Sequence, residues 1–318
     1  MFFDMHADIW TNTLWEYEKG NKNIIRRKFR HKFEKGNMTG GIFVIWLDDY
    51  ENPETRFIKA LRIMSEELHY TEDFIHIVKN NEDFNTAKKN NKLAIILGIE
   101  GLSGIGRNLD YIYLLEQLGI RHIGLTWNES NAIATGQNGN PGRGLSKLGI
   151  DALKIIENLG ILLDLSHVND KTFWDVAKHA KKPFFASHSN SRILCPSMRN
   201  LTDDQLMCIK ERSGMVGLNS YHNFVSHMDN KKTLDMLIQH LEYIAEKIGL
   251  DKVGFGFDFA DYYAREEETV RDLKDLADAG DLNNIVSILK KRGYSSHEID
   301  MIAHKNFISF FNRVRNNK

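Results

Sequence analysis

The chain has 318 residues, and its 42 Lys and Arg residues nearly balance 43 Asp and Glu residues, giving a formal net charge of -1. This balance argues against a dedicated nucleic-acid-binding protein, which would carry a basic excess. Two cysteines exclude both a disulfide scaffold and a four-thiolate zinc site. The count of 13 histidines directs the search for chemistry to imidazole groups.

Neither end of the sequence carries a targeting signal. The first ten residues, MFFDMHADIW, lack the basic and apolar regions of a secretory signal. The last six, RVRNNK, are polar and carry no anchor signal. No apolar run reaches the length of about 18 residues that a membrane-spanning helix requires. We therefore expect a protein of the reduced cytoplasm that does not contact a membrane.

Short apolar segments at regular spacing predict eight strands. In chain order they are residues 2–6, 41–47, 93–99, 122–126, 161–165, 183–187, 214–219 and 253–257. Several of them are apolar without alternation, which is typical of parallel strands that are buried on both faces. Such strands occur almost only in α/β proteins, where helices cover the sheet.

The segments between these strands are long enough for helical crossovers. Residues 234–248 carry apolar side chains at helical spacing, and Gly249 follows as a helix stop. Residues 202–205 form a capping box at the start of another helix. Two more helices, over 282–291 and 296–312, are expected to pack on the outside.

Strands that alternate with helices in this way predict an α/β fold of the (β/α)8 TIM-barrel type. The alternative is an open, doubly wound sheet. A chain of 318 residues could form two domains, but α/β barrels of this size are common as single domains. We expect one barrel domain over residues 1–318, with extra C-terminal helices from about residue 281.

Polar side chains with metal-ligand chemistry stand at the ends of five predicted strands. They are His6, Asp8, Glu100, His167, His188 and Asp258. In a barrel these strand ends converge on one mouth, where active sites lie. Imidazole with carboxylate is a zinc-type ligand set, and six groups exceed the need of one tetrahedral ion. The set therefore favours a binuclear site with a bridging carboxylate.

The motifs that carry these residues occur in a specific order. They are Asp-x-His-x-Asp at 4–8, Gly-Ile-Glu-Gly at 98–101, Asp-Leu-Ser-His-Val at 164–168, Ser-His-Ser at 187–189, Arg-Asn-Leu-Thr-Asp-Asp at 199–204 and Gly-Phe-Gly-Phe-Asp-Phe at 254–259. Together they resemble the membrane dipeptidase (renal dipeptidase) family of zinc peptidases, from position 4 to about position 260. The resemblance implies a barrel of the metal-dependent hydrolase type with two Zn2+ ions, a dipeptide substrate and a homodimer.

The resemblance also implies a role for each site residue. His6 and Asp8 would hold the first zinc, Glu100 would bridge both ions, and His167 and His188 would complete the second. Such a centre activates a bridging water for attack on an amide bond.

Two further residues would recognise the ends of the substrate. Arg199 would bind the carboxylate of the C-terminal residue, which in this family can be a D-amino acid. Asp258 would contact the free amine and transfer the proton during catalysis. Recognition of both ends would restrict the enzyme to dipeptides.

The chain departs from the family pattern after its fourth predicted strand. The animal enzymes carry a histidine there that contacts the substrate, whereas this chain has Trp127 followed by Asn128. The role passes to Trp127, to Asn128 or to the metals alone. A second departure is that the acidic residue after Asp258 moves to Asp261.

Three other functions compete with this interpretation. Another binuclear amidohydrolase, such as an N-acyl-amino-acid deacylase, a lactonase or a phosphotriesterase, usually shows His-x-His on the first strand; here His6 is followed by Asp8. A non-catalytic, metal-stabilised binding protein would not need Asp258. A dinucleotide-binding oxidoreductase needs a G-x-G-x-x-G turn, which residues 101–106 do not provide.

Overall fold

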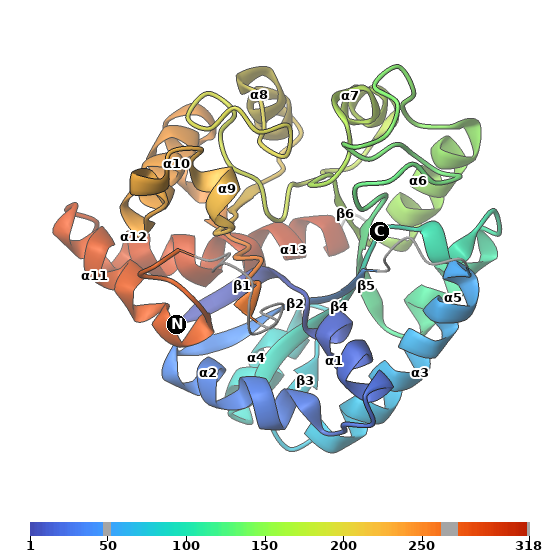
Figure 1. Cartoon of the computed structure of the whole chain (residues 1–318), viewed down its shortest axis with the longest axis horizontal. Helices are drawn as coiled ribbons and strands as arrows, with labels where there is room; N and C mark the ends of the chain where they lie inside the picture. Colours follow the sequence, from blue (N-terminus) through green and yellow to red (C-terminus); the bar gives the residue numbers. More distant parts are fainter. Residues whose placement is uncertain (47–51, 262–272, 317–318) are drawn as a thin grey trace. The chain divides into compact units, whose positions relative to one another are not determined.

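The structure, a computed structural model, describes residues 1–46, 52–261 and 273–316. Strands and helices alternate along most of the chain (Figure 1). The strands are β1 (Phe2–Ala7), β2 (Met38–Trp46), β3 (Ile75–Ile77), β4 (Leu93–Glu100), β5 (Ile120–Gly124), β6 (Leu162–Asp164), β7 (Val216–Leu218) and β8 (Val253–Phe255). Hydrogen-bonded neighbours follow the order β6-β5-β4-β2-β1-β8-β7, and β3 pairs with β4.

Thirteen α-helices lie among the described residues. They are α1 (Ile9–Glu18), α2 (Arg30–Lys35), α3 (Pro53–Thr71), α4 (Glu82–Lys89), α5 (Asp110–Gln117), α6 (Lys147–Leu159), α7 (Asp170–His179), α8 (Asp203–Glu211), α9 (His222–Val225), α10 (Leu234–Ile248), α11 (Asn283–Lys291), α12 (Ser296–Asp300) and α13 (Asn306–Asn316). None of the helices in the described ranges has the length and apolar character needed to cross a membrane.

The chain divides into two compact units that interleave along the sequence. The first unit comprises Met1–Ala7, Arg26–Gly41 and Ala186–Phe310. The second comprises Asp8–Ile25, Ile42–Phe185 and Phe311–Lys318. Strand β2 begins in the first unit and ends in the second. The expectation of a single domain stays a prediction.

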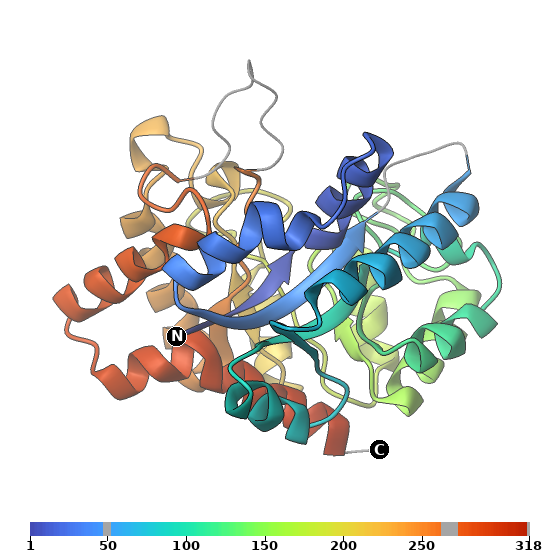
Figure 2. The ribbon, with the colours of Figure 1, turned by 90° about the horizontal axis from the view of Figure 1, so that it is seen from below.

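The first unit is built on the parallel strands β1, β8 and β7. Asp4 of β1 lies opposite Phe255 of β8, and β8 pairs residue by residue with β7. The ring of Phe255 stacks on that of Phe257 at a centroid distance of 5.1 Å, so aromatic side chains fill this part of the core. Helix α10 has the predicted apolar stripe on its buried side, and Gly249 follows its last residue. Helices α11 and α12 pack against each other (Figure 2).

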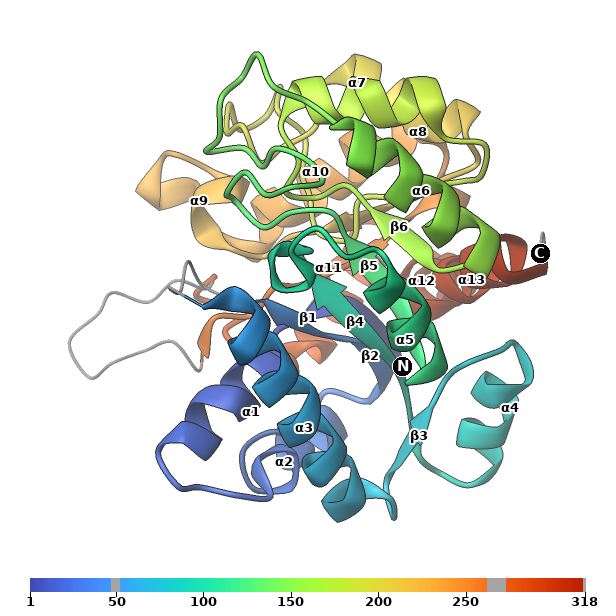
Figure 3. The ribbon, with the colours of Figure 1, turned by 90° about the vertical axis from the view of Figure 1, so that its right-hand side faces the viewer.

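The second unit is built on β3, β4, β5 and β6, which are all parallel. Helix α3 packs against α1 (Figure 3). Helix α6 is capped at its N-terminus by Ser146, whose hydroxyl accepts a hydrogen bond from Gly149 N, and at its C-terminus by Gly160, where φ is +64°. These strand ends and helix caps fix the positions of the loops that follow each strand.

The predicted strand at 183–187 is wrong as a strand. Phe185 forms a parallel bridge with Asp164 within the second unit, and Ala186 forms one with Val216 within the first. Phe185 and Ala186 each form a single bridge, and a single bridge is too short to count as a strand. The strand β3 was not predicted, because three residues are too few to establish a pattern. Residue 47 of the predicted strand 41–47 lies outside the described residues.

The predicted helix over 296–312 is interrupted. It consists of α12, a π-helical turn at Met301–Lys305, and α13. A π turn accommodates one extra residue without ending the helix, and apolar spacing does not reveal it in advance. The capping boxes of α8, at Thr202 and Gln205, and of α12 are both present.

Candidate metal centre

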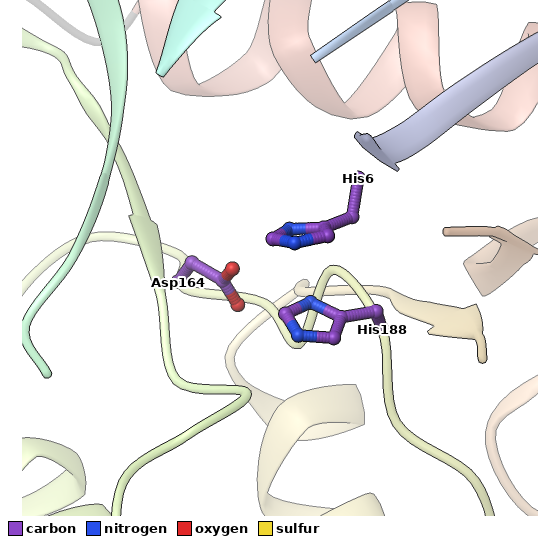
Figure 4. A group of neighbouring side chains, drawn as sticks. All are labelled: His6, Asp164 and His188. Carbon is purple, nitrogen blue, oxygen red and sulfur yellow. The ribbon is translucent and has the colours of Figure 1, made fainter. Parts of the chain in front are cut away.

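Two stacked imidazoles form the centre of the candidate site in the first unit. The rings of His6, on β1, and His188 lie 3.6 Å apart between centroids, with an angle of 29° between their planes (Figure 4). Both residues are fully buried. An imidazole binds a metal ion through a ring nitrogen, so two buried rings at this separation are suited to hold a cation.

The hydroxyl of Ser187 orients both rings. Its Oγ lies 2.6 Å from His188 Nδ1 and 3.5 Å from His6 Nδ1. Because the Nδ1 atoms face this hydroxyl, the Nε2 atoms are the ones that can serve as metal ligands. A second partner that fixes the outer ring nitrogen is typical of metal-binding histidines.

The main chain before His188 passes unusually close to two glycines. A Cβ atom at Gly217 or at Gly256 would lie 1.9 Å from the Ser187 carbonyl oxygen. Any side chain at either position would displace this carbonyl and the imidazole that follows it. The two glycines therefore hold His188 at its position relative to β7 and β8.

Asp258 follows β8 in a left-handed backbone conformation, with φ at +57°. Among residues other than glycine, aspartate and asparagine tolerate this region best. Its Oδ2 accepts a hydrogen bond from Asn219 Nδ2 at 2.9 Å, and its Oδ1 lies 4.0 Å from His6 Nε2. The Asp258 side chain is 21% exposed, so a substrate can reach it.

The buried carboxyl group of Asp4 contacts the main chain next to both His6 and Asp258. Asp4 Oδ1 accepts hydrogen bonds from the backbone N–H groups of His6 and Phe257. Burial raises the pKa of Asp4 to about 8, although these two hydrogen bonds act in the opposite direction. Asp4 thereby ties the end of β1 to the segment after β8.

Arg199 is the predicted carboxylate-binding residue, and it lies on the loop that follows His188. Its guanidinium is buried, with Nη2 donating to the His188 carbonyl at 3.2 Å and Nη1 to Ser189 Oγ at 3.4 Å. It also lies over the ring of Phe224, 5.3 Å from the centroid. The guanidinium is thus held in one orientation by the same loop that carries His188.

The second unit supplies an imidazole and a carboxylate in direct contact. Glu100 ends β4, His167 follows β6, and His167 Nε2 lies 2.9 Å from Glu100 Oε1. The other ring nitrogen, Nδ1, lies 2.9 Å from Asn128 Oδ1. A carboxamide oxygen only accepts, so Nδ1 carries a proton. The contact between Nε2 and Glu100 then requires either a second proton or a cation between the two atoms, which fits a metal-ligand pair.

Two more buried carboxylates lie in the second unit. Asp8 precedes α1 and is 6% exposed, and its side chain does not cap that helix. Asp164 ends β6 and accepts hydrogen bonds from Ser166 N, Ser166 Oγ and His122 Nε2. Carboxylates are costly to bury without a partner, so this density of acidic groups favours a cation.

An aromatic stack borders His167. The indoles of Trp46 and Trp127 are parallel within 9°, with centroids 4.6 Å apart, and Trp15 meets Trp46 edge-on. The centroid of Trp127 lies 6.2 Å from that of His167. The structure thus places Trp127 beside a predicted metal ligand, and Asn128 against that ligand's ring.

Buried His, Asp and Glu residues with the chemistry of metal ligands lie in both units. In the first unit they are His6 and His188 (Figure 4), and in the second they are Asp8, Glu100, Asp164 and His167. They include all five predicted ligands. Asp164 is an addition: it stands in the motif at 164–168 but was not predicted as a ligand.

Asn219 is a second residue that sequence reasoning missed. It stands directly after β7, is fully buried and donates to Asp258. Its position at a strand end was the available signal, but an uncharged carboxamide gives no indication of its partner.

Known proteins resemble this chain along most of its length. The model of the membrane dipeptidase family (peptidase family M19) matches residues 2–318. An uncharacterized protein from the 5' region of pqqA in Klebsiella pneumoniae is 31% identical over 268 residues, which cover 80% of this chain and 95% of that protein.

Solved structures show the same similarity. A metallopeptidase from Rhodobacter sphaeroides, liganded with a phosphinate mimic of L-Ala-D-Ala, has a TM-score of 0.86 and 25% identity, covering 98% of this chain and 99% of that one. A crystal structure of a dipeptidase described as a metallopeptidase has a TM-score of 0.87 and 25% identity, covering 98% of both chains. The predicted α/β TIM-barrel fold of the metal-dependent hydrolase type is confirmed.

Proposed function

Because the chain belongs to the membrane dipeptidase family, we propose that it is a zinc-dependent dipeptidase that hydrolyses the amide bond of free dipeptides. The substrates include dipeptides with a D-amino acid at the C-terminal position. The observation that supports this most directly is the contact between His167 Nε2 and Glu100 Oε1 at 2.9 Å, because Asn128 fixes the imidazole so that its inner nitrogen faces a carboxylate.

In this proposal two Zn2+ ions are held by the five predicted ligands. His6 and Asp8 would hold one ion, His167 and His188 would hold the other, and Glu100 would be shared between the two. The donor chemistry fits zinc, since neutral imidazoles and carboxylates are its usual ligands in proteins. Two such ions would supply Lewis-acid chemistry: they would acidify a bound water for attack near neutral pH and polarise the scissile carbonyl.

The chain's own residues bind and orient the substrate. Arg199 binds the C-terminal carboxylate, for which its planar fork of donors is suited. Its contacts with the His188 carbonyl and Ser189 hold that fork in place. Trp127 lies against the substrate beside His167, and Asn128 contributes by orienting His167.

Asp258 acts at the amino end of the substrate. It contacts the free amine, and as general base and then general acid it moves a proton to the leaving nitrogen. Its partial exposure and its hydrogen bond from Asn219 support this role, because the carboxylate is both accessible and oriented. We further propose a cytoplasmic homodimer.

The test is a metal and substrate analysis of the purified protein. Mass spectrometry should find about two metal ions per chain, and a panel of L-L and L-D dipeptides should be cleaved. N-acetylated dipeptides and N-acetyl amino acids serve as controls. Cleavage of N-acetyl amino acids without cleavage of free dipeptides would indicate a deacylase. Fewer than two metals together with no dipeptide cleavage would contradict the proposal.

A further inference from the structure

Asn219 lies close to Asp258 and Arg199, the two residues proposed to bind the ends of the substrate. We propose that it is a positioning residue: its carboxamide holds the Asp258 carboxylate and, through the His188 carbonyl, links it to the Arg199 guanidinium. This inference rests on the proposed function, in which Asp258 meets the amine of the dipeptide and Arg199 meets its carboxylate.

The orientation of the Asn219 side chain is fixed by its neighbours. Its Oδ1 accepts a hydrogen bond from the backbone N–H of Tyr221 at 2.7 Å, so the amide nitrogen faces the other way. That nitrogen donates to Asp258 Oδ2 at 2.9 Å and to the His188 carbonyl at 3.4 Å. The Nδ2 group of Asn219 therefore donates to two acceptors of the candidate site, the Asp258 carboxylate and the His188 carbonyl.

The His188 carbonyl is a shared acceptor. It receives Asn219 Nδ2 at 3.4 Å and Arg199 Nη2 at 3.2 Å. The carbonyl belongs to the segment that Gly217 and Gly256 hold by close approach. Asp258 and Arg199 are thus connected by three hydrogen bonds, which pass through the Asn219 carboxamide and the His188 carbonyl.

The main chain of Asn219 is also held. Its N–H donates to Asn190 Oδ1 at 3.0 Å, and its carbonyl accepts from Asn190 Nδ2 at 2.9 Å. The backbone N–H of Asn190 in turn donates to Asn200 Oδ1 at 3.1 Å, next to Arg199. All three asparagines are buried. A fully bonded, buried polar network is rigid, so the separation between Asp258 and Arg199 is fixed before any substrate arrives.

This separation bears on substrate length. In the proposed function a dipeptide spans this separation, and an extended peptide with one more residue, about 3.3–3.6 Å longer, would not match it at both ends. The inference therefore assigns to Asn219 an indirect part in the selection of dipeptides.

The experiment measures binding, so that it does not depend on turnover. Calorimetry gives the affinity of the metal-loaded protein for a phosphinate analogue of a free dipeptide. The variants are Asn219→Ala, Asp258→Gly and the double variant. Glycine is chosen at 258 because it accepts the left-handed backbone there.

Asn306→Ala is the matched control. Asn306 is also a buried asparagine of the first unit, and its Nδ2 donates to the carbonyls of Leu250 and Val253. Asn306 is the first residue of α13, and its acceptors lie at the beginning of β8, whereas Asp258 follows the end of that strand. Both alanine variants therefore remove a buried carboxamide, but Asn219→Ala alone removes a contact with Asp258.

We expect Asn219→Ala to weaken binding roughly 10-fold, because a hydrogen bond to a charged group is lost. The same change in the Asp258→Gly background should cause a much smaller loss, which reflects only the contact with the His188 carbonyl. Metal content should equal that of the wild type, and Asn306→Ala should bind normally. An equal loss in both backgrounds, or a similar loss in Asn306→Ala, would overturn the inference.

The isosteric variant Asn219→Asp keeps the experiment decisive if Asn219→Ala does not fold. It replaces the donor with a second carboxylate facing Asp258, so weaker binding is again expected, and wild-type affinity would show that Asn219 only fills space. If the wild-type protein itself neither cleaves dipeptides nor binds the analogue, the proposed function fails instead.

Discussion

The contact of Asn128 with His167 can be tested by metal binding, separately from catalysis. Asn128 holds the outer nitrogen of His167 at 2.9 Å, and the inner nitrogen faces Glu100. Removing such a partner from a metal-binding histidine weakens metal affinity by about 10–100-fold, or about 1.4–2.7 kcal/mol. We therefore expect Asn128→Ala to weaken, by this amount, the binding of the metal ion that His167 is proposed to hold, because His167 loses its fixed tautomer and orientation.

The assay is competition with a chelator, which measures the dissociation constant of each ion directly. Asn128→Asp is the matched control, since its carboxylate still accepts the Nδ1 proton, and it should retain the wild-type affinity. Excess metal should restore the activity of Asn128→Ala. Unchanged affinity in Asn128→Ala, or a loss of activity that excess metal does not restore, would refute the assignment of His167 as a metal ligand oriented by Asn128.

Three further predictions concern the substrate-binding residues and the core. Asp258→Asn should lower kcat by about 10²–10⁴-fold with metal content unchanged, measured by steady-state kinetics with metal analysis; wild-type turnover in the variant would exclude a catalytic role for Asp258. Arg199→Lys should raise KM for free dipeptides by about 10–100-fold and change that for C-terminally amidated ones little; an equal change for both would exclude carboxylate recognition. Burial lowers the pKa of His240 from 6.5 to about 4, so the unfolded chain binds more protons than the folded one between these values. The free energy of unfolding should therefore decrease as the pH is lowered below 6.5, by about 2 kcal/mol between pH 7 and pH 5. Guanidinium unfolding should show a smaller fall for His240→Gln; an identical pH dependence would contradict the neutral, buried state of His240.

The parts of the site that sequence alone predicts are those with a charge or an imidazole at a strand end. Glu100 and His167 could be found because parallel strands end at the same edge, and the structure brings their side chains into contact. Asn128 could be placed near the site but not assigned to His167, since a carboxamide can donate or accept. Asn219 was missed for the same reason: its function is defined by its partners, Asp258 and the His188 carbonyl.

For the fold, long apolar strands such as β4 were predictable, because burial on both faces leaves a continuous apolar run. The segment at 183–187 has a similar composition but forms only single bridges. Pairing of this kind depends on the main chain of β6 and β7, which composition does not describe. The π turn at Met301–Lys305 is also a backbone feature with no distinct side-chain pattern.

The interleaving of the two units has a consequence for synthesis on the ribosome. Asp4 of β1 pairs with Phe255 of β8, so β1 lacks this neighbour until 251 more residues have been made. At about 5–20 residues per second, this takes about 12–50 seconds. During that interval Phe2 and Phe3, which are buried in the folded protein, have no completed sheet to pack against. The first residues of the chain therefore depend on late folding, and the nascent protein is expected to need protection from aggregation in the cell.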